Sequence, residues 1–183
     1  MRYPIVYADP PWRYRHCQSD TRKIENHYPT MSLEEIKALQ VPAEKDSVLY
    51  LWTTTAKLVE AIEVMSAWGF DYRSSMVWDK KVDGMGFWFR GRHEFLLVCV
   101  KGQFSPPEES LRVSSILRVK RAAHSDKPDI VRTWLDRWYP DLYKLEMFAR
   151  DHTPLFKREK WHMWGNEVRS DIDMGSVNNE EAV

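Results

Sequence analysis

The tetrapeptide Asp9-Pro10-Pro11-Trp12 combines residue types that suit the recognition of a planar amine. It follows a short apolar run, residues 5–8, that is typical of a buried strand, and open α/β sheets bind their ligands at such strand ends. The two prolines fix the backbone and remove two amide donors, which leaves peptide carbonyls free beside a carboxylate and a large flat ring. Acceptors next to a stacking platform suit a planar group that bears an NH2, such as adenine. The alternative is a strand end followed by a rigid turn.

The elements that must position this segment alternate between strands and helices. Ser32-Leu33-Glu34-Glu35 is a capping box that opens a helix. Gly69 ends a second helix, and Pro128 lies near the start of a third. Strands separated by helices predict an α/β fold with a mostly parallel sheet and helices on both faces. The predicted strands are residues 3–8, 48–52, 72–78, 93–100, 143–148 and 161–164, and the predicted helices are 33–39, 56–68 and a third from 126 onward.

The buried faces of two helices can be read from their apolar spacing. The second helix is expected to bury Leu58, Ile62 and Met65. Three segments remain unassigned, at residues 13–30, 80–92 and 102–126, and loops of this length are usually functional or mobile. The third helix is expected to place on one face Ile130, Val131, Trp134, Leu135 and Trp138.

Length and composition restrict the class of protein. The 183 residues suit one domain, expected over residues 1–168, and a disordered acidic tail is expected over 169–183. Two distant cysteines, Cys17 and Cys99, form no C-x-x-C pair and predict a reducing compartment, the cytoplasm. No apolar run approaches the roughly 18 residues of a membrane span, and the N-terminus has no signal-peptide pattern. The six histidines lack ligand spacing, so no metal site is expected.

Five short motifs follow one another along the chain: Ala8-Asp9-Pro10-Pro11-Trp12, His27-Tyr28-Pro29-Thr30-Met31, Ser125-Asp126-Lys127-Pro128-Asp129, Glu146-Met147-Phe148-Ala149-Arg150 and Trp164-Gly165-Asn166-Glu167. Together they resemble the MT-A70 family of adenine N6-methyltransferases over about residues 3–168. The resemblance implies a Rossmann-like fold that uses S-adenosylmethionine, with S-adenosylhomocysteine as product and no metal. A Gly-rich cofactor loop is missing here, as it is in that family.

The expected chemistry concerns the exocyclic N6 of adenine, whose lone pair is delocalised into the ring. The Asp9 carboxylate and the Pro10 carbonyl are expected to accept its hydrogens, which favours a pyramidal and more nucleophilic nitrogen. Pro11 completes the rigid segment, and Trp12 is expected to stack on the base, a contact worth roughly 1–3 kcal/mol. Orientation of N6 against the methyl group supplies much of the remaining rate. Asp9 also places a negative charge near the cationic cofactor.

The resemblance implies further roles, residue by residue. Tyr28 is expected to close over the base, and Glu94 to lie near the substrate pocket, although an ordinary strand-end carboxylate is its alternative. Ser125 and Lys127 match a loop that touches substrate and cofactor. Lys127 is expected to pair with the carboxylate of the methionine moiety, and its alternative is a solvated residue at a helix start. The implied cofactor contacts, besides Asp9 and Lys127, are Glu146, Phe148, Arg150, His152, Asn166 and Glu167.

The chain departs from some members of the family at three of these motifs. Asp126 stands where some carry His, Thr153 where some carry Asn, and Glu167 where some carry Gln. These departures affect the ribose and substrate-loop contacts, not the reaction.

Basic residues next to the unassigned loops predict a phosphate-binding rim. The preferred hypothesis is an adenine N6-methyltransferase of a bacterial or phage-infected cell that acts on nucleic acid, with DNA favoured over RNA because no added RNA-binding module is seen. The alternatives are an RNA methyltransferase, a non-catalytic nucleic-acid-binding subunit and an enzyme of free nucleotides. A homodimer or heterodimer is plausible. The three basic clusters are Arg112, Arg118, Lys120 and Arg121, then Arg90 and Arg92, then Arg150, Lys157, Arg158 and Lys160.

Overall fold

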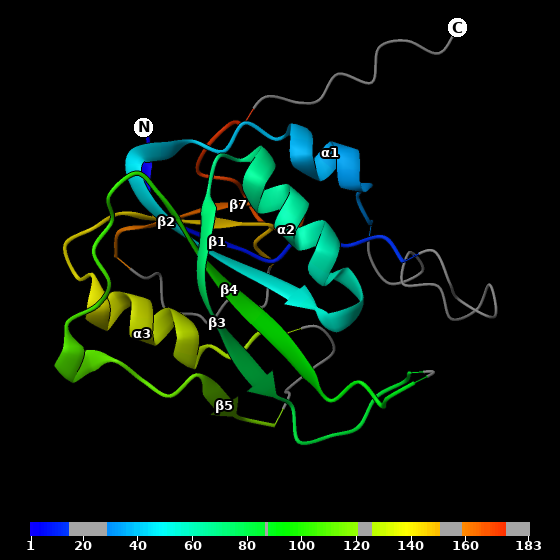
Figure 1. The fold of residues 1–183 in the computed structure, drawn as a ribbon. Coiled ribbons are helices and arrows are strands. Elements are labelled where there is room, and N and C mark those ends of the chain that lie inside the picture. The colour runs from blue at the N-terminus through cyan, green and yellow to red at the C-terminus, as the bar shows by residue number, and fades with distance from the viewer. Residues whose placement is uncertain (15–28, 87, 121–125, 151–158, 175–183) are drawn as a thin grey trace, which may run out of the picture.

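One seven-stranded sheet organises the protein, and its strands follow the order β5-β3-β4-β2-β1-β6-β7 (Figure 1). The computed structural model describes residues 1–14, 29–86, 88–120, 126–150 and 159–174. Within these residues the strands are β1 (Tyr3–Ala8), β2 (Ala43–Thr54), β3 (Asp71–Asp79), β4 (His93–Lys101), β5 (Ile116–Arg118), β6 (Lys144–Met147) and β7 (Trp161–Trp164).

The strand directions bring six carboxyl ends to one edge of the sheet. β1 pairs in parallel with β2 and β6, β6 with β7, and β3 with β5. β4 alone runs against its neighbours β2 and β3. The carboxyl ends of the other strands therefore meet the amino end of β4 at one edge, called the carboxyl edge below. The predicted α/β fold with a mostly parallel sheet is confirmed.

Helices cover both faces of the sheet. α1 (Leu33–Ala38) and α2 (Leu58–Ala67) lie on one face, and α3 (Ile130–Trp138) lies on the other (Figure 1). Short 3₁₀ turns occupy Thr55–Lys57 and Glu109–Leu111. The capping box at α1 is present, because the Ser32 hydroxyl accepts from the Glu35 amide while the Glu35 carboxylate accepts from the Ser32 amide at 2.6 Å. None of the helices in the described residues is long and apolar enough to cross a membrane.

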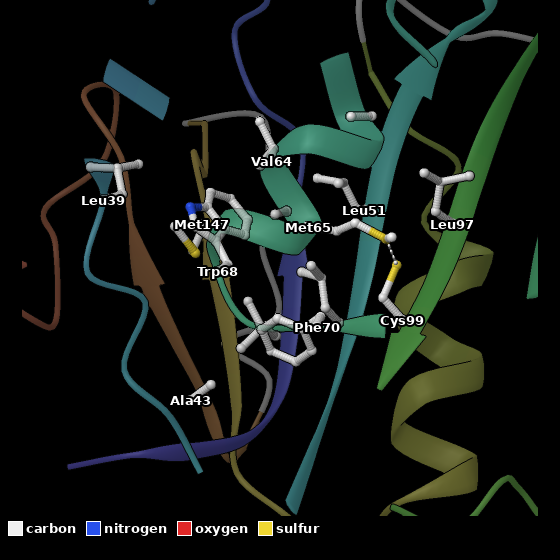
Figure 2. Close-up of a cluster of buried hydrophobic side chains, with 14 of the residues drawn as sticks. Leu39, Ala43, Leu51, Val64, Met65, Trp68, Phe70, Leu97, Cys99 and Met147 are labelled. Carbon is white, nitrogen blue, oxygen red and sulfur yellow. Dashed lines mark hydrogen bonds between the residues drawn. The ribbon is translucent and has the colours of Figure 1, made fainter. Parts of the chain in front are cut away.

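The two sheet faces carry separate hydrophobic cores. On the α1–α2 face, Met65, Trp68 and Phe70 pack with residues of the sheet such as Leu51 and Cys99 (Figure 2). The other core lies under α3, where Val131 and Leu135 pack on side chains of β1, β2, β3 and β4. All six residues of β1 are buried, and from Ile5 to Ala8 each is at most 1% exposed, since these side chains alternate between the two cores. This double burial explains the uninterrupted apolar run in its sequence.

Two predicted helix faces need correction. Ile62 of α2 is 44% exposed and Ile130 of α3 is 40% exposed, so neither belongs to the core. On α2 the buried residues are Ala61, Val64 and Met65, so Met65 was predicted correctly, Leu58 packs against the first core, and only Ile62 was wrong. On α3 the helix buries Arg132 between its apolar residues, because a carboxylate of the sheet lies opposite. Apolar spacing alone did not predict this buried charge.

Two further segments differ from the sequence-based expectation. β5 lies inside the unassigned segment 102–126, and only Leu117 of its three residues is buried. One buried residue in three forms no apolar pattern from which a strand can be predicted. Residues 169–174 belong to the expected tail, yet Asp171 donates its amide to the Met163 carbonyl at 2.8 Å and Ile172 packs against the first core. These contacts anchor the chain beyond Arg169, and residues 175–183 lie outside the described residues.

Candidate active site

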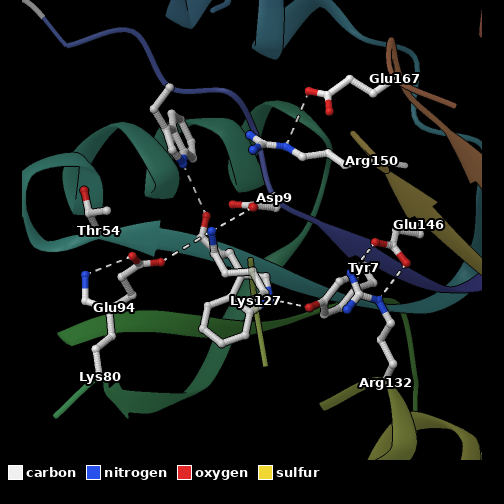
Figure 3. A network of polar contacts seen from close by, with 12 residues as sticks. Tyr7, Asp9, Thr54, Lys80, Glu94, Lys127, Arg132, Glu146, Arg150 and Glu167 are labelled. Carbon is white, nitrogen blue, oxygen red and sulfur yellow. Dashed lines mark hydrogen bonds and ion pairs between the residues drawn. The ribbon is translucent and has the colours of Figure 1, made fainter. Parts of the chain in front are cut away.

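The carboxyl edge brings together charged residues from three distant parts of the sequence. Asp9 directly follows β1, which lies between β2 and β6, where the strand order reverses. The Lys127 ammonium donates to Asp9 Oδ2 at 2.7 Å and lies 3.4 Å from Glu94 Oε2 (Figure 3). Lys80 in turn donates to Glu94 Oε1 at 3.1 Å. Lys80, Glu94, Lys127 and Asp9 thus form a row of alternating charges, called the charge row below.

Burial makes the charge row an electrostatic unit. The side chain of Lys127 is 9% exposed, and those of Glu94 and Asp9 are 14% and 20% exposed. Burial raises the pKa of Asp9, and Lys127 offsets this only in part. Burial would also raise the pKa of Glu94, but Lys127 and Lys80 outweigh it and hold that pKa below its ordinary value. The two carboxylates in turn overcome burial and raise the pKa of Lys127, which stays protonated.

These contacts define the surroundings of two predicted site residues, whose roles toward substrate and cofactor stay predictions. Glu94 is a buried partner of two lysines and not an ordinary strand-end carboxylate. Lys127 is not a solvated residue at a helix start, because it bridges two carboxylates and lies over the Trp52 ring at 5.8 Å. Lys80 was not predicted as a site residue. Its position directly after a strand, like that of Asp9, was the signal available for it.

The Pro-Pro-Trp segment differs from the expected geometry. The Pro10 carbonyl accepts from the Trp12 amide at 2.9 Å, and the Pro11 carbonyl accepts from the Met31 amide at 2.9 Å. The expectation that these carbonyls are free is therefore wrong, because the chain turns back and pairs Met31 with Trp12. Each carbonyl retains one further lone pair.

Trp12 also lies deeper than a stacking platform requires. Its side chain belongs to the first core, and the residue is 6% exposed. Its indole N–H donates to the Trp52 carbonyl at 3.3 Å. The ring is therefore largely buried beside the Asp9 segment, although Trp12 also lines a pocket with Met31 and Lys57, and its stacking on a base stays a prediction. Exposure depends on what packs against the ring, and the tetrapeptide sequence does not specify it.

A small pocket adjoins Asp9 and collects most of the predicted cofactor residues. It lies between the loops after β1, β6 and β7, and the Arg150 Nε is 3.9 Å from Glu167 Oε1 (Figure 3). Phe148 has φ +61 and meets the Trp164 ring edge-on, with 5.4 Å between ring centres. The pocket residues include Asp9, Pro11, Phe148, Arg150, Asn166 and Glu167.

The pocket depends on a close approach between the turns after β6 and β7. The Ala149 amide donates to the Trp164 carbonyl at 2.9 Å. A Cβ at Gly165 would lie 2.3 Å from the Ala149 carbonyl oxygen, so this position requires glycine. Gly165 therefore sets the spacing of the two loops that carry Phe148 and Asn166.

Glu146 has a different place from the one expected. It is 4% exposed on the α3 side of the sheet, and Arg132 donates to both of its oxygens, with Nε to Oε2 at 2.8 Å (Figure 3). The guanidinium also lies over the Tyr7 ring at 5.0 Å, and the Tyr7 hydroxyl accepts from the Trp52 indole at 2.7 Å. Glu146 does not line the pocket beside Asp9, and it forms a buried ion pair with Arg132. Arg132, within the apolar stripe of α3, was the signal for this pair.

Three predicted site residues lie outside the described residues, namely Tyr28, Ser125 and His152. Among the residues that are described, no cluster of three or more His, Cys, Asp or Glu side chains is arranged to hold a metal ion.

The expected basic rim is partly assembled. Arg92 and Arg118 lie at the carboxyl edge, where Arg118 pairs in register with Asp79. Arg112 precedes β5 and Lys160 precedes β7, so both residues lie toward the amino ends of these strands, at the edge of the sheet opposite the carboxyl edge. Their assignment to the rim was wrong. Arg121, Lys157 and Arg158 lie outside the described residues.

A mostly parallel α/β sheet with a polar site at the switch point of its carboxyl edge defines a Rossmann-like methyltransferase fold. Residues 3–167 match the family model MT-A70, and the chain belongs to the MT-A70 family of adenine N6-methyltransferases. The resemblance in the sequence motifs is thereby confirmed.

Two groups of relatives match the chain to different extents. The chain is 33% identical over 187 residues to the Type II methyltransferase M.MunI of Mycoplasma sp, which covers 91% of this chain and 78% of that protein. It is 28% identical to the N(6)-adenosine-methyltransferase MT-A70-like protein of Drosophila melanogaster, and 27% identical to the N(6)-adenosine-methyltransferase catalytic subunit METTL3 of Homo sapiens. The match again covers 91% of this chain, but only 27% and 28% of those two proteins.

Proposed function

We propose that this methyltransferase modifies the N6 of adenine in nucleic acid, and that DNA is its substrate. The Asp9 carboxylate carries the proposal, because it lies at the switch point beside the pocket of the predicted cofactor residues. DNA is favoured because the match covers most of the length of a Type II methyltransferase. By contrast, it covers only about a quarter of the length of each N(6)-adenosine-methyltransferase. A nucleic-acid substrate and the free thiol of Cys99 both fit the cytoplasm expected from the sequence.

Asp9 acts as the acceptor for an N6 hydrogen. Lys127 occupies Oδ2, and Oδ1 has no hydrogen-bond partner among the described residues. An amino group that enters the site meets this oxygen, and the raised pKa of Asp9 makes it a stronger acceptor. Holding the hydrogen in this way draws the N6 lone pair out of conjugation with the ring. Lys127 and Glu94 keep the carboxylate in place through the charge row.

The side chains that line the pocket beside Asp9 suit the chemical groups of S-adenosylmethionine. Phe148 offers an apolar ring, Asn166 and Glu167 offer polar groups for ribose hydroxyls, and Arg150 offers a cation. Asp9 adds a negative charge suited to a sulfonium. When bound, S-adenosylmethionine supplies the methyl group and leaves as S-adenosylhomocysteine. The family uses this donor, and the residue assignments are part of the proposal.

The test offers purified protein and methyl-labelled S-adenosylmethionine to matched pools of single-stranded DNA, duplex DNA and RNA. After digestion, mass spectrometry distinguishes N6-methyldeoxyadenosine, expected here, from N6-methyladenosine, which would move the substrate to RNA. Asp9→Asn should abolish the label, and Asp141→Asn is the matched control, since the Asp141 side chain is 94% exposed. No label in any pool, with cofactor bound, would contradict the proposal and favour a non-catalytic subunit. Sedimentation of the same samples tests the proposed homodimer or heterodimer.

A further inference from the structure

The connection between β3 and β4, residues 80–92, forms a hairpin that projects from the carboxyl edge (Figure 1). Backbone hydrogen bonds close its neck. Lys80 donates to the Arg92 carbonyl at 3.0 Å, Gly84 donates to Gly91 at 2.9 Å, and Gly91 donates to Met85 at 3.1 Å. The segment therefore continues the antiparallel pairing of β3 and β4 beyond the edge of the sheet.

The tip of the hairpin presents large apolar side chains to solvent. Met85 is 78% exposed, Phe89 is 89% exposed and Trp88 is 94% exposed. A Cβ at Gly86 would lie 2.0 Å from the Phe89 carbonyl oxygen, so the tight turn requires glycine and sets the shape of the tip. Apolar side chains that cluster on an exposed surface mark a site of interaction.

The root of the hairpin is part of the active site. Lys80 at its start binds Glu94, which follows its end by two residues, and Glu94 lies beside Lys127 of the charge row. Phe89 is five residues from Glu94, so the tip lies at most about 17 Å from it along the chain. Stacked nucleotides are spaced about 3.4 Å apart along one strand. The tip therefore reaches bases within about five nucleotides of a target adenine.

The charges around the tip favour a polyanion. Lys81 and Arg90 are exposed, and in the part of the chain that the structure describes neither forms an ion pair. Arg118 and Lys120 lie at the adjacent end of β5 and are also exposed. Residues 79–92 contain four basic and two acidic side chains, and both of the acidic ones lie near Arg92. Aromatic side chains flanked by unpaired cations suit bases and phosphates better than they suit a protein surface.

We propose that this hairpin is a nucleic-acid contact, in which Trp88 and Phe89 stack on the bases that flank the target adenine. Lys81 and Arg90 contact the adjoining phosphates. Because chemistry on a base requires that it leave the stack, apolar side chains beside the site support the strand that is left behind. The inference rests on the proposed nucleic-acid substrate and adds to it a recognition element outside the catalytic pocket.

The test measures binding of a fluorescein-labelled 30-nucleotide mixed-sequence DNA, single-stranded and duplex, by anisotropy at several salt concentrations. Each stacked base contributes about 5- to 150-fold to affinity, so Trp88→Ala/Phe89→Ala should weaken binding at least about tenfold. The salt dependence should stay the same, because no charge is removed. Lys81→Ala/Arg90→Ala should instead lower the salt slope by about two. Val59→Ala, on α2 and 69% exposed, is the apolar control.

The outcomes separate this inference from the proposed reaction. Thermal melts establish that each variant is folded, and Asp141→Asn, at an exposed position outside the site, should bind the DNA as the wild-type protein does. Binding by Trp88→Ala/Phe89→Ala that equals wild type, or absence of DNA binding by the wild-type protein, overturns the inference. A shift from dimer to monomer in sedimentation, with DNA affinity per subunit unchanged, overturns it in favour of a protein interface. Failure of the reaction would instead appear as bound DNA that is never methylated.

Discussion

Replacement of Arg132 by methionine is expected to cause a large loss of stability. The side chains of Arg132 and Glu146 are 11% and 6% exposed and share two hydrogen bonds, so both charges are removed from water. Loss of one partner leaves the other charge buried without compensation, which costs about 3–5 kcal/mol. Domains have a free energy of unfolding of about 5–15 kcal/mol, so this is a large fraction of the total. For a chain of this size the melting temperature should fall by roughly 6–20 °C.

The double variant Arg132→Met/Glu146→Leu should recover most of this loss. It removes both charges and leaves apolar side chains against Tyr7 and Leu135 of the second core. Because well-packed apolar residues can replace a buried ion pair at little cost, we expect a coupling energy of about 3 kcal/mol.

Urea unfolding followed by circular dichroism measures the four corners of this cycle. Arg137→Met, at an exposed position on the same helix, is the matched control and should change the free energy of unfolding by less than about 0.5 kcal/mol. The reasoning is refuted if Arg132→Met behaves like this control, or if the two single losses simply add. Calorimetry of the folded double variant with S-adenosylmethionine tests the other role of Glu146. Unchanged affinity is expected here, and a large loss would restore Glu146 as a cofactor contact.

Three further outcomes are expected. The pKa of Glu94 is lower in the folded protein than in the unfolded chain, where it is about 4.3, so the Glu94 carboxylate stabilises the fold at a pH above 4.3. This stabilisation is lost as the pH falls through the pKa of the folded state. Glu94→Gln should therefore have a lower melting temperature than wild type at pH 7, and the difference in melting temperature should disappear in acid. Gly102 has φ +63, and a Cβ there would lie 2.2 Å from Asp46 Oδ1, so Gly102→Ala should lower the free energy of unfolding by about 1–3 kcal/mol; an unchanged urea midpoint would contradict this. Burial raises the pKa of Cys99 to about 12, so in a Cys17→Ser variant a maleimide should label the protein only after unfolding, and rapid labelling of the native protein at pH 8 would disprove it.

Local patterns predicted the fold where a segment carries its own signal. The apolar run of β1 and the capping box of α1 are properties of a few adjacent residues, and both were recognised. β5 has three residues with one buried side chain, so its strand character comes from pairing with β3, as in the bond from the Val77 amide to the Ser115 carbonyl. On α2 the choice between Ala61 and Ile62 depends on the rotation of the helix over the sheet. Hydrophobicity predicts that Ile62 is buried, but the orientation of the helix over the sheet buries Ala61 and exposes Ile62.

The sequence by itself determined the family, the order of its motifs and the position of Asp9 after a buried central strand. Only the tertiary structure decided which charges meet. Glu94 and Lys127 are far apart in the chain, and their contact follows from an antiparallel strand whose amino end reaches the edge where Asp9 lies. The sequence of β6 alternates polar and apolar residues, Lys144-Leu145-Glu146-Met147, yet all four are buried. Alternation alone would place Glu146 in solvent, and only the structure shows that a helix covers its side of the sheet. Its partner Arg132 lies on α3, the helix that covers this face of the sheet. The packing of α3 on the sheet depends on contacts between segments far apart in the chain, so neither residue alone predicts the pair.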